Sequence, residues 1–262
     1  MQKLYAQLEK WFGDYVMQFH SKDPHFQKNI EVKREHSYQV HANMEKMGIR
    51  MELNEEQQLV AEAIGLLHDI GRFEQFRRYQ TFYDKVSVDH ADLGVSVLQE
   101  LNVLQEWPQE AQEWVLTAIK WHNKKALPED LSETERLYCK LIRDADKLDI
   151  WRVVTAYYCR MDEETNNTLQ LDLPDTPGYQ PINVERIRQH EMVDLQDLKN
   201  LNDFKLLQVG WVFDINFATT LALLKQRNYL TPLFASLPND DIIGELKKEV
   251  ENYIEKVLTN NG

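Results

Sequence analysis

Hydrophobic residues recur three and four positions apart along nearly the whole chain, which is the repeat of an amphipathic helix. Gly48 and Gly71 are placed to end two of these helices, and Ser132 forms a capping box with Glu135 at the start of another. The repeat therefore predicts an all-α fold. The predicted helices cover residues 1–20, about 29–47 and about 54–70, and three more begin near Asp89, at Pro108 and at Ser132.

Two stretches lose the helical repeat. Residues 72–88 are aromatic and basic, and they predict a loop with a short helix. Residues 162–182 contain three prolines and an Asn-Asn pair, which predicts a long loop with a small hairpin at Leu169–Leu173. The predicted organisation is a helical core over 1–161, an irregular loop over 162–182 and a C-terminal helical extension over 183–262 that packs on the core.

The C-terminal extension resumes the helical spacing near Asn183. Its longest apolar run, Val209–Leu224, contains Asp214 and Asn216, so it predicts a buried helix and not a membrane span. The last helix follows Asn239-Asp240 and is the most regular. Its predicted buried face consists of Ile242, Leu246, Val250, Tyr253 and Val257.

The composition narrows the class of protein. Hydrophobic residues make up 43% of the 262 residues, which is enough for a sizeable core, and only 9 glycines argue against a many-stranded sheet. The formal net charge of −13 repels phosphate backbones, so we expect no nucleic acid polymer as a partner. The two cysteines, Cys139 and Cys159, form no disulfide or zinc pattern, and no secretory signal is visible. We therefore expect a reduced, cytoplasmic protein with no membrane association.

Five predicted helices each place a His or Asp on an apolar stripe: His36, His68 with Asp69, His90, His122 and Asp146. A single histidine of this kind is more often a hydrogen-bonded core residue. Five such positions in one small core would cost roughly 1–3 kcal/mol each if they were left unpaired. A shared metal ion removes that cost, and imidazole and carboxylate ligands without thiolate suit iron, manganese, zinc, cobalt or nickel.

This order of residues resembles the HD-domain superfamily of metal-dependent phosphohydrolases, whose pattern is H…HD…H…H…D on an all-helical core. His68-Asp69-Ile70-Gly71-Arg72 looks like the family's HDIG motif, and residues 143–149 resemble its closing aspartate motif. The resemblance covers about residues 30–155. It implies an HD-domain helical bundle over the core, with the C-terminal helices as an addition.

The resemblance also implies the metal ligands. His36, His68, Asp69 and Asp146 would hold a first metal. His90 and His122 would hold a second metal with Asp69 as the bridge, although a substrate-contacting or supporting role for these two histidines stays open. The implied cofactor is one or two divalent transition metals per chain, namely Mn, Fe, Co, Ni or Zn, with Mg²⁺ as a further option.

Some assignments remain open at this stage. By helical period Asp144 also faces inward, but the family's closing motif favours Asp146 as the last ligand, and Asp149 is expected to support a ligand histidine or to be solvated. Arg72 and Lys147 resemble positions at which the family binds phosphate, and with Asp69 they are the predicted catalytic residues. Weaker cationic candidates are Lys124, Arg77 and Arg78, and the aromatic segment Phe73–Tyr83 is either a lid over a nucleobase or part of the packed core.

The resemblance implies hydrolysis of a small phosphorylated compound, most plausibly a nucleotide or related phosphoester. Cyclic dinucleotides are disfavoured because the GYP segment of the HD-GYP phosphodiesterases is missing. Two alternatives stay open: an HD-fold diiron oxygenase, and a non-catalytic protein in which a closed metal site ties the helices together. The oligomeric state is not predicted.

Overall fold

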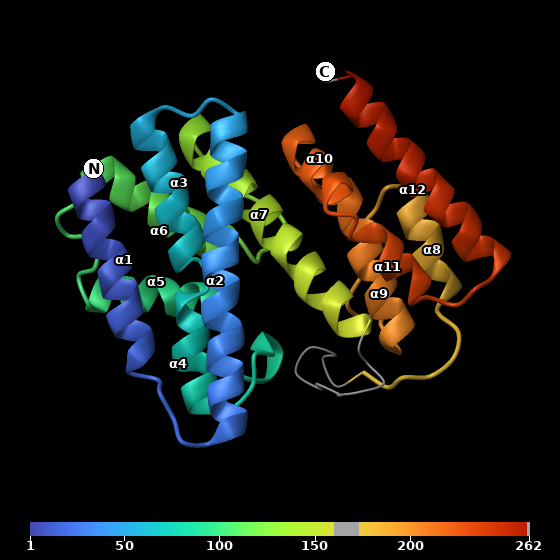
Figure 1. The fold of residues 1–262 in the computed structure, drawn as a ribbon, viewed down its shortest axis with the longest axis horizontal. Coiled ribbons are helices and arrows are strands. Elements are labelled where there is room, and N and C mark those ends of the chain that lie inside the picture. Colours follow the sequence, from blue (N-terminus) through green and yellow to red (C-terminus); the bar gives the residue numbers. More distant parts are fainter. Residues whose placement is uncertain (160–172, 261–262) are drawn as a thin grey trace. The chain divides into compact units, whose positions relative to one another are not determined.

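The computed structural model describes residues 1–159 and 173–260, and in these residues it contains helices and no strand (Figure 1). The all-α prediction is therefore confirmed. The α-helices are α1 (Gln2–Met17), α2 (Pro24–Arg50), α3 (Glu55–Leu67), α4 (Ile70–Tyr79), α5 (His90–Glu100), α6 (Gln109–Trp121), α7 (Glu133–Tyr158), α8 (Pro181–Arg188), α9 (Leu201–Gly210), α10 (Ala218–Gln226), α11 (Leu230–Ala235) and α12 (Asp241–Asn260). Two short 3₁₀ helices, η1 (Asp84–Val86) and η2 (Trp211–Asp214), lie among them.

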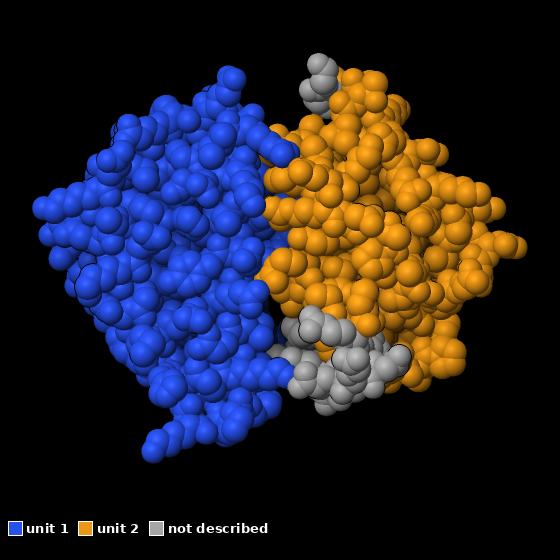
Figure 2. Space-filling view, in the orientation of Figure 1, with its two compact units in different colours: residues 1–149 blue, residues 150–262 orange. Residues whose placement is uncertain are grey.

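The chain divides into two compact units, Met1–Asp149 and Ile150–Gly262, which Figure 2 colours blue and orange. The division falls inside α7. The predicted core of 1–161, the loop of 162–182 and the packing of 183–262 on the core stay predictions. The predicted hairpin at Leu169–Leu173 lies almost entirely outside the described residues.

The helices of the first unit begin at the residues that sequence chemistry favours. The Asp23 carboxylate accepts hydrogen bonds from the first turn of α2, and Pro24 occupies the first helical position, where no amide hydrogen is needed. At the start of α7, the Glu135 carboxylate accepts from the Ser132 amide while the Ser132 hydroxyl accepts from the Glu135 amide, so the predicted capping box is present. Helix α2 begins earlier and ends later than predicted, and Gly48 lies inside it.

The predicted third helix, about 54–70, corresponds to α3, which ends slightly earlier than predicted. Helix α3 ends at Leu67, and α4 begins at Ile70, so the dipeptide His68-Asp69 forms the junction. Residues 72–88, expected to be a loop with a short helix, contain more helix than expected, because α4 continues to Tyr79 and buries Phe73 and Phe76 completely. At Gly71 a β-carbon would stand 2.2 Å from the main-chain oxygen of His90, so glycine is required where α4 meets α5.

Two predictions for the second unit need correction. The apolar run Val209–Leu224 is not one helix, because α9 ends at Gly210 and α10 begins only at Ala218 after a 3₁₀ turn. In α12 the predicted Leu246 and Val250 are buried, but Ile243 and Ile254 complete that face, and the predicted Ile242 is 47% exposed. Within the described residues, no helix combines the length and the apolar character needed to cross a bilayer.

Candidate metal centre

The four histidines of the predicted pattern meet in the first unit, each buried, with their Nε2 atoms in two close pairs. His68 and His122 are the residues that end α3 and α6. In each, Nδ1–H donates to the main-chain oxygen three residues earlier, at 2.9 Å to Gly65 and 2.7 Å to Ile119. This local bond turns Nε2 of both rings away from their own helices.

The other two histidines are held by carboxylates. His36, in the middle of α2, donates from Nδ1 to Oδ2 of Asp149 at 2.7 Å. His90, the first residue of α5, donates from Nδ1 to Oδ2 of Asp84 at 2.6 Å. A carboxylate or carbonyl oxygen can only accept a hydrogen bond here, so the Nδ1 atom of each of the four rings carries a proton. The four Nε2 atoms are then free to bind a metal through their lone pairs or to hold a second proton.

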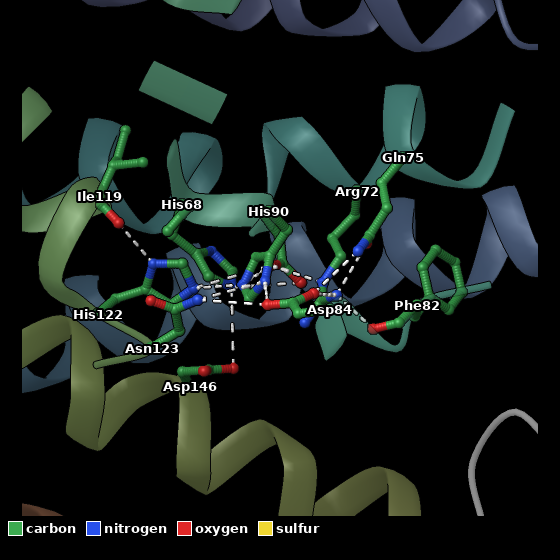
Figure 3. A network of polar contacts seen from close by, with 12 residues as sticks. His68, Arg72, Gln75, Phe82, Asp84, His90, Ile119, His122, Asn123 and Asp146 are labelled. Atoms are coloured by element: carbon green, nitrogen blue, oxygen red, sulfur yellow. Dashed lines mark hydrogen bonds and ion pairs between the residues drawn. The ribbon is translucent and has the colours of Figure 1, made fainter. Parts of the chain in front are cut away.

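The first cluster brings together three of the predicted ligands on separate helices. The Nε2 atoms of His36 and His68 are 3.2 Å apart. Asp146 reaches toward them from α7, with Oδ1 3.1 Å from Nε2 of His36 and 3.7 Å from Nε2 of His68 (Figure 3). The structure thus places Asp146 at this cluster, as the sequence argument preferred, while Asp144 is buried elsewhere on the same helix.

The second cluster joins His90 and His122, whose Nε2 atoms are 3.0 Å apart. Asp69 lies between the two clusters at the start of α4. Its Oδ2 is 3.5 Å from Nε2 of His36 and 3.8 Å from that of His68, while its Oδ1 is 3.3 Å and 3.8 Å from those of His90 and His122. Each carboxylate oxygen therefore faces one histidine pair, which is the arrangement of a bridging ligand.

The electrostatics of the second pair suit a cation. Burial lowers the pKa of both His90 and His122 to about 4, with Arg72 acting further on His90 and His68 on His122. Both rings are therefore neutral near neutral pH. With their protons held on Nδ1, two Nε2 lone pairs and a carboxylate oxygen converge with no hydrogen between the rings. Three acceptors this close fit a divalent metal ion, which would use all of them.

In the first cluster, a proton on His36 takes the place that a metal ion would occupy. Burial alone would lower the pKa of His36, but hydrogen bonds to Asp146 and Asp149 raise it to about 9. The pKa of His68 is lowered by burial. Burial opposes ionisation of Asp69, yet Lys33 and the neighbouring His68 and Arg72 hold its pKa well below the usual range. The donor set of both clusters thus fits metal binding, in which a metal replaces the proton on His36.

The predicted phosphate-binding cations lie in different surroundings. The Arg72 guanidinium donates from one nitrogen to Asp84, Gln75 and the main-chain oxygen of Phe82, and its Nε is 3.5 Å from Oδ1 of Asp69 (Figure 3). Lys147 is half-buried, with Nζ 3.5 Å from the main-chain oxygen of Arg143. The weaker candidates pair with surface acids: Lys124 with Asp89 and Asp92, and Arg77 and Arg78 both with Glu74.

Within the aromatic segment Phe73–Tyr83, some side chains pack in the core and others lie near the candidate metal centre. Phe73 packs edge-on against Phe12 and Tyr15 of α1, so as a core residue it cannot form a lid. Phe82 differs, because it is only half-buried and lies beneath two cations, with Nζ of Lys33 5.2 Å and the Arg72 guanidinium 5.9 Å from its ring centre.

Sequence reasoning missed two residues at this centre. Lys33 donates to Oδ2 of Asp69 at 2.8 Å from one turn before His36 on α2, and that spacing could have revealed it. Asp84 holds His90 from the non-helical segment after α4, where no periodicity predicts a direction. The remaining histidines lie elsewhere: His20, His25 and His190 are exposed, and His41 bonds the Tyr5 hydroxyl.

Four histidines and two aspartates thus converge on one site in a helical core, and His and Asp groups of this kind could hold metal ions. Residues 34–151 match the HD domain family model. That part of the chain is an HD domain, and the further C-terminal helices are additional to it. Comparisons with curated proteins and with solved structures give no match.

Proposed function

We propose that this protein is a metal-dependent phosphohydrolase acting on a small phosphorylated compound, namely a nucleotide or related phosphoester. The observation that carries the proposal is the Asp69 carboxylate, which turns one oxygen to each of two histidine pairs. HD domains are typically phosphohydrolases of this kind, and buried His and Asp groups that could hold metal ions support the assignment.

His36, His68, Asp146 and Oδ2 of Asp69 would hold the first metal, and His90, His122 and Oδ1 of Asp69 the second. When bound, divalent metal ions supply Lewis acidity for a phosphoryl oxygen and activate a water molecule. The metal is of the Mn, Fe, Co, Ni, Zn or Mg type, because the donor set contains imidazole and carboxylate and no thiolate.

The chain's own residues supply the remaining requirements. Asp149, 1% exposed, keeps the His36 ring oriented. Lys147, which follows Asp146 directly, is the proposed contact for the substrate phosphate. Lys33 adds a second cation at the centre and lies over Phe82, which leaves an aromatic face beside a positive charge. Such a pairing suits a phosphate attached to a planar group.

Metal analysis of protein purified without chelator or affinity metal tests the proposal, with hydrolysis of nucleotide and phosphomonoester panels beside it. We expect metal-dependent phosphate release, which Asp69→Asn abolishes because both clusters lose their shared ligand. His122→Ala should retain one metal per chain where the wild type holds two. Protein that takes up no Mn, Fe, Co, Ni, Zn or Mg after reconstitution would contradict the proposal. Tightly bound iron with oxygen consumption and no phosphate release would favour an oxygenase instead.

A further inference from the structure

Each cluster contains one histidine whose Nδ1 atom is bound by an aspartate, and the two aspartates lie in different surroundings. Asp149, the partner of His36, lies on α7 and is 1% exposed. Asp84, the partner of His90, begins the 3₁₀ turn η1 in the connection between α4 and α5, and its side chain is 28% exposed. The first cluster is therefore supported from a long helix, and the second from a partly exposed connecting segment.

That segment is tied to α4 through the other oxygen of Asp84. Oδ1 of Asp84 accepts from Arg72 at 2.7 Å and from Gln75 at 2.8 Å. Arg72 also donates to the main-chain oxygen of Phe82 (Figure 3). Gln75 also donates to the Ser87 hydroxyl and to the main-chain oxygen of Val88. Asp84 thus has one oxygen on His90 and the other on α4, the helix that begins at the bridging Asp69.

The Arg72 guanidinium donates to Asp84, Gln75 and the connecting segment. Oδ2 of Asp84 accepts from Nδ1 of His90 at 2.6 Å while Oδ1 accepts from Arg72 at 2.7 Å, so Arg72 and His90 hold opposite oxygens of the same carboxylate. A carboxylate that accepts from Nδ1–H fixes the ring of His90, leaves Nε2 without the proton and makes Nε2 a stronger electron-pair donor to a metal.

We propose that Asp84 is a positioning residue for the second metal, and that Arg72 acts through Asp84 by clamping the connecting segment to α4. The proposal rests on the proposed function, because it concerns the second metal of that site. It replaces the expected direct contact of Arg72 with phosphate by an indirect role. It also implies unequal sites, with the second metal bound more weakly than the first because its support is partly exposed.

The matched pair Asp84→Asn and Asp149→Asn tests the inference. Both substitutions remove one negative charge beside a ligand histidine, one at each cluster. Manganese titrations of metal-free protein by calorimetry, with metal content measured after gel filtration, give the two affinities separately. We expect Asp84→Asn to weaken the second metal about 10- to 100-fold and to leave the first unchanged, and Asp149→Asn to do the reverse. Arg72→Gln should also weaken the second metal selectively, and Arg72→Lys should restore part of the loss.

Other outcomes separate the two hypotheses. Two metals in the wild type with unchanged second-site affinity in Asp84→Asn overturn the role of Asp84 and leave the proposed function intact. If the wild type binds only one metal and Asp84→Asn does not change its affinity, the role of Asp84 is likewise overturned and the proposed function stays intact. Equal weakening of both metals in Asp84→Asn also overturns it, because that result indicates a general structural defect. A wild type that binds no metal overturns the proposed function itself. Circular dichroism of each metal-free variant reports folding, and Asp84→Glu, which keeps the charge, replaces Asp84→Asn if the latter does not fold.

Discussion

Nζ of Lys33 lies 2.8 Å from Oδ2 of Asp69, the oxygen that also faces the first histidine pair. The lysine therefore occupies a carboxylate oxygen that a first metal would use. Its side chain is only 18% exposed, so water screens the charge weakly. Lys33 and a divalent ion thus compete for one oxygen and repel each other.

This competition predicts that Lys33→Met tightens the first metal site. Removing the ammonium frees Oδ2 and removes a positive charge near the cluster, and we expect metal affinity to rise on the order of tenfold, which is about 1.4 kcal/mol. Isothermal titration of the metal-free protein measures the change. Lys46→Met, an exposed position on the same helix, is the control and should leave affinity unchanged. Weaker metal binding in Lys33→Met would mean that Lys33 positions Asp69 and does not compete for it.

Gly71 predicts a stability effect at the same centre. An added β-carbon would stand 2.2 Å from the main-chain oxygen of His90 and 2.6 Å from the amide nitrogen of Gly94, and neither backbone atom can turn away. We expect Gly71→Ala to separate α4 from α5, lowering the free energy of unfolding by about 1–3 kcal/mol or more and weakening the second metal. Urea denaturation measures the loss. Gly13→Ala in α1, with nothing within 4 Å of the added carbon, should be neutral or stabilising by about 0.5–1 kcal/mol. Equal effects of the two substitutions would contradict this reasoning.

The sequence predicts which His and Asp residues lie close together better than it predicts the bounds of the helices that carry them. His36 and His90 lie on helical stripes, and a buried polar residue on a stripe is visible from period alone. The sequence places the end of the third helix at Ile70 instead of Leu67, because two helices meet at His68-Asp69 with only those two residues between them and the apolar repeat continues across the junction. The helix assigned to Val209–Leu224 failed for a related reason, because apolar composition does not reveal a 3₁₀ turn.

The helical repeat does not predict contacts between segments that only the tertiary structure brings together. Asp84 lies six residues before His90, in a segment with no regular spacing, and only the fold turns it toward the imidazole. Asp149 lies 113 residues after His36, and the sequence left open whether it supports a ligand histidine or is solvated. The spacing of Lys33 from His36 places the lysine near the site, but it does not identify Asp69 as its partner, because that contact joins α2 to the start of α4.

Asp146 and the second histidine pair serve different clusters, which predicts a selective effect. Asp146→Asn removes a carboxylate oxygen 3.1 Å from Nε2 of His36 and has no described contact with His90. We expect the first metal to weaken while the second remains, the mirror image of His122→Ala. Metal content of each purified variant, with electron paramagnetic resonance of bound Mn²⁺ to detect paired ions, measures the outcome. Loss of the second metal alone in Asp146→Asn would reassign this ligand.

The buried neutral histidines predict acid lability of the metal-free protein. Burial lowers the pKa of His90 and His122 to about 4 from the ordinary 6.5. As pH falls from 6.5 toward 4, the unfolded chain gains protons at both positions and the folded chain does not, so stability falls across that window. His36, whose pKa is raised to about 9, contributes fully below 6.5 and loses its contribution as pH rises through 9, so it does not mask the acid effect. Urea unfolding of chelator-treated protein across this window measures the slope. His122→Gln, uncharged at every pH, should show a shallower slope, and an unchanged slope would assign the acid sensitivity to other groups.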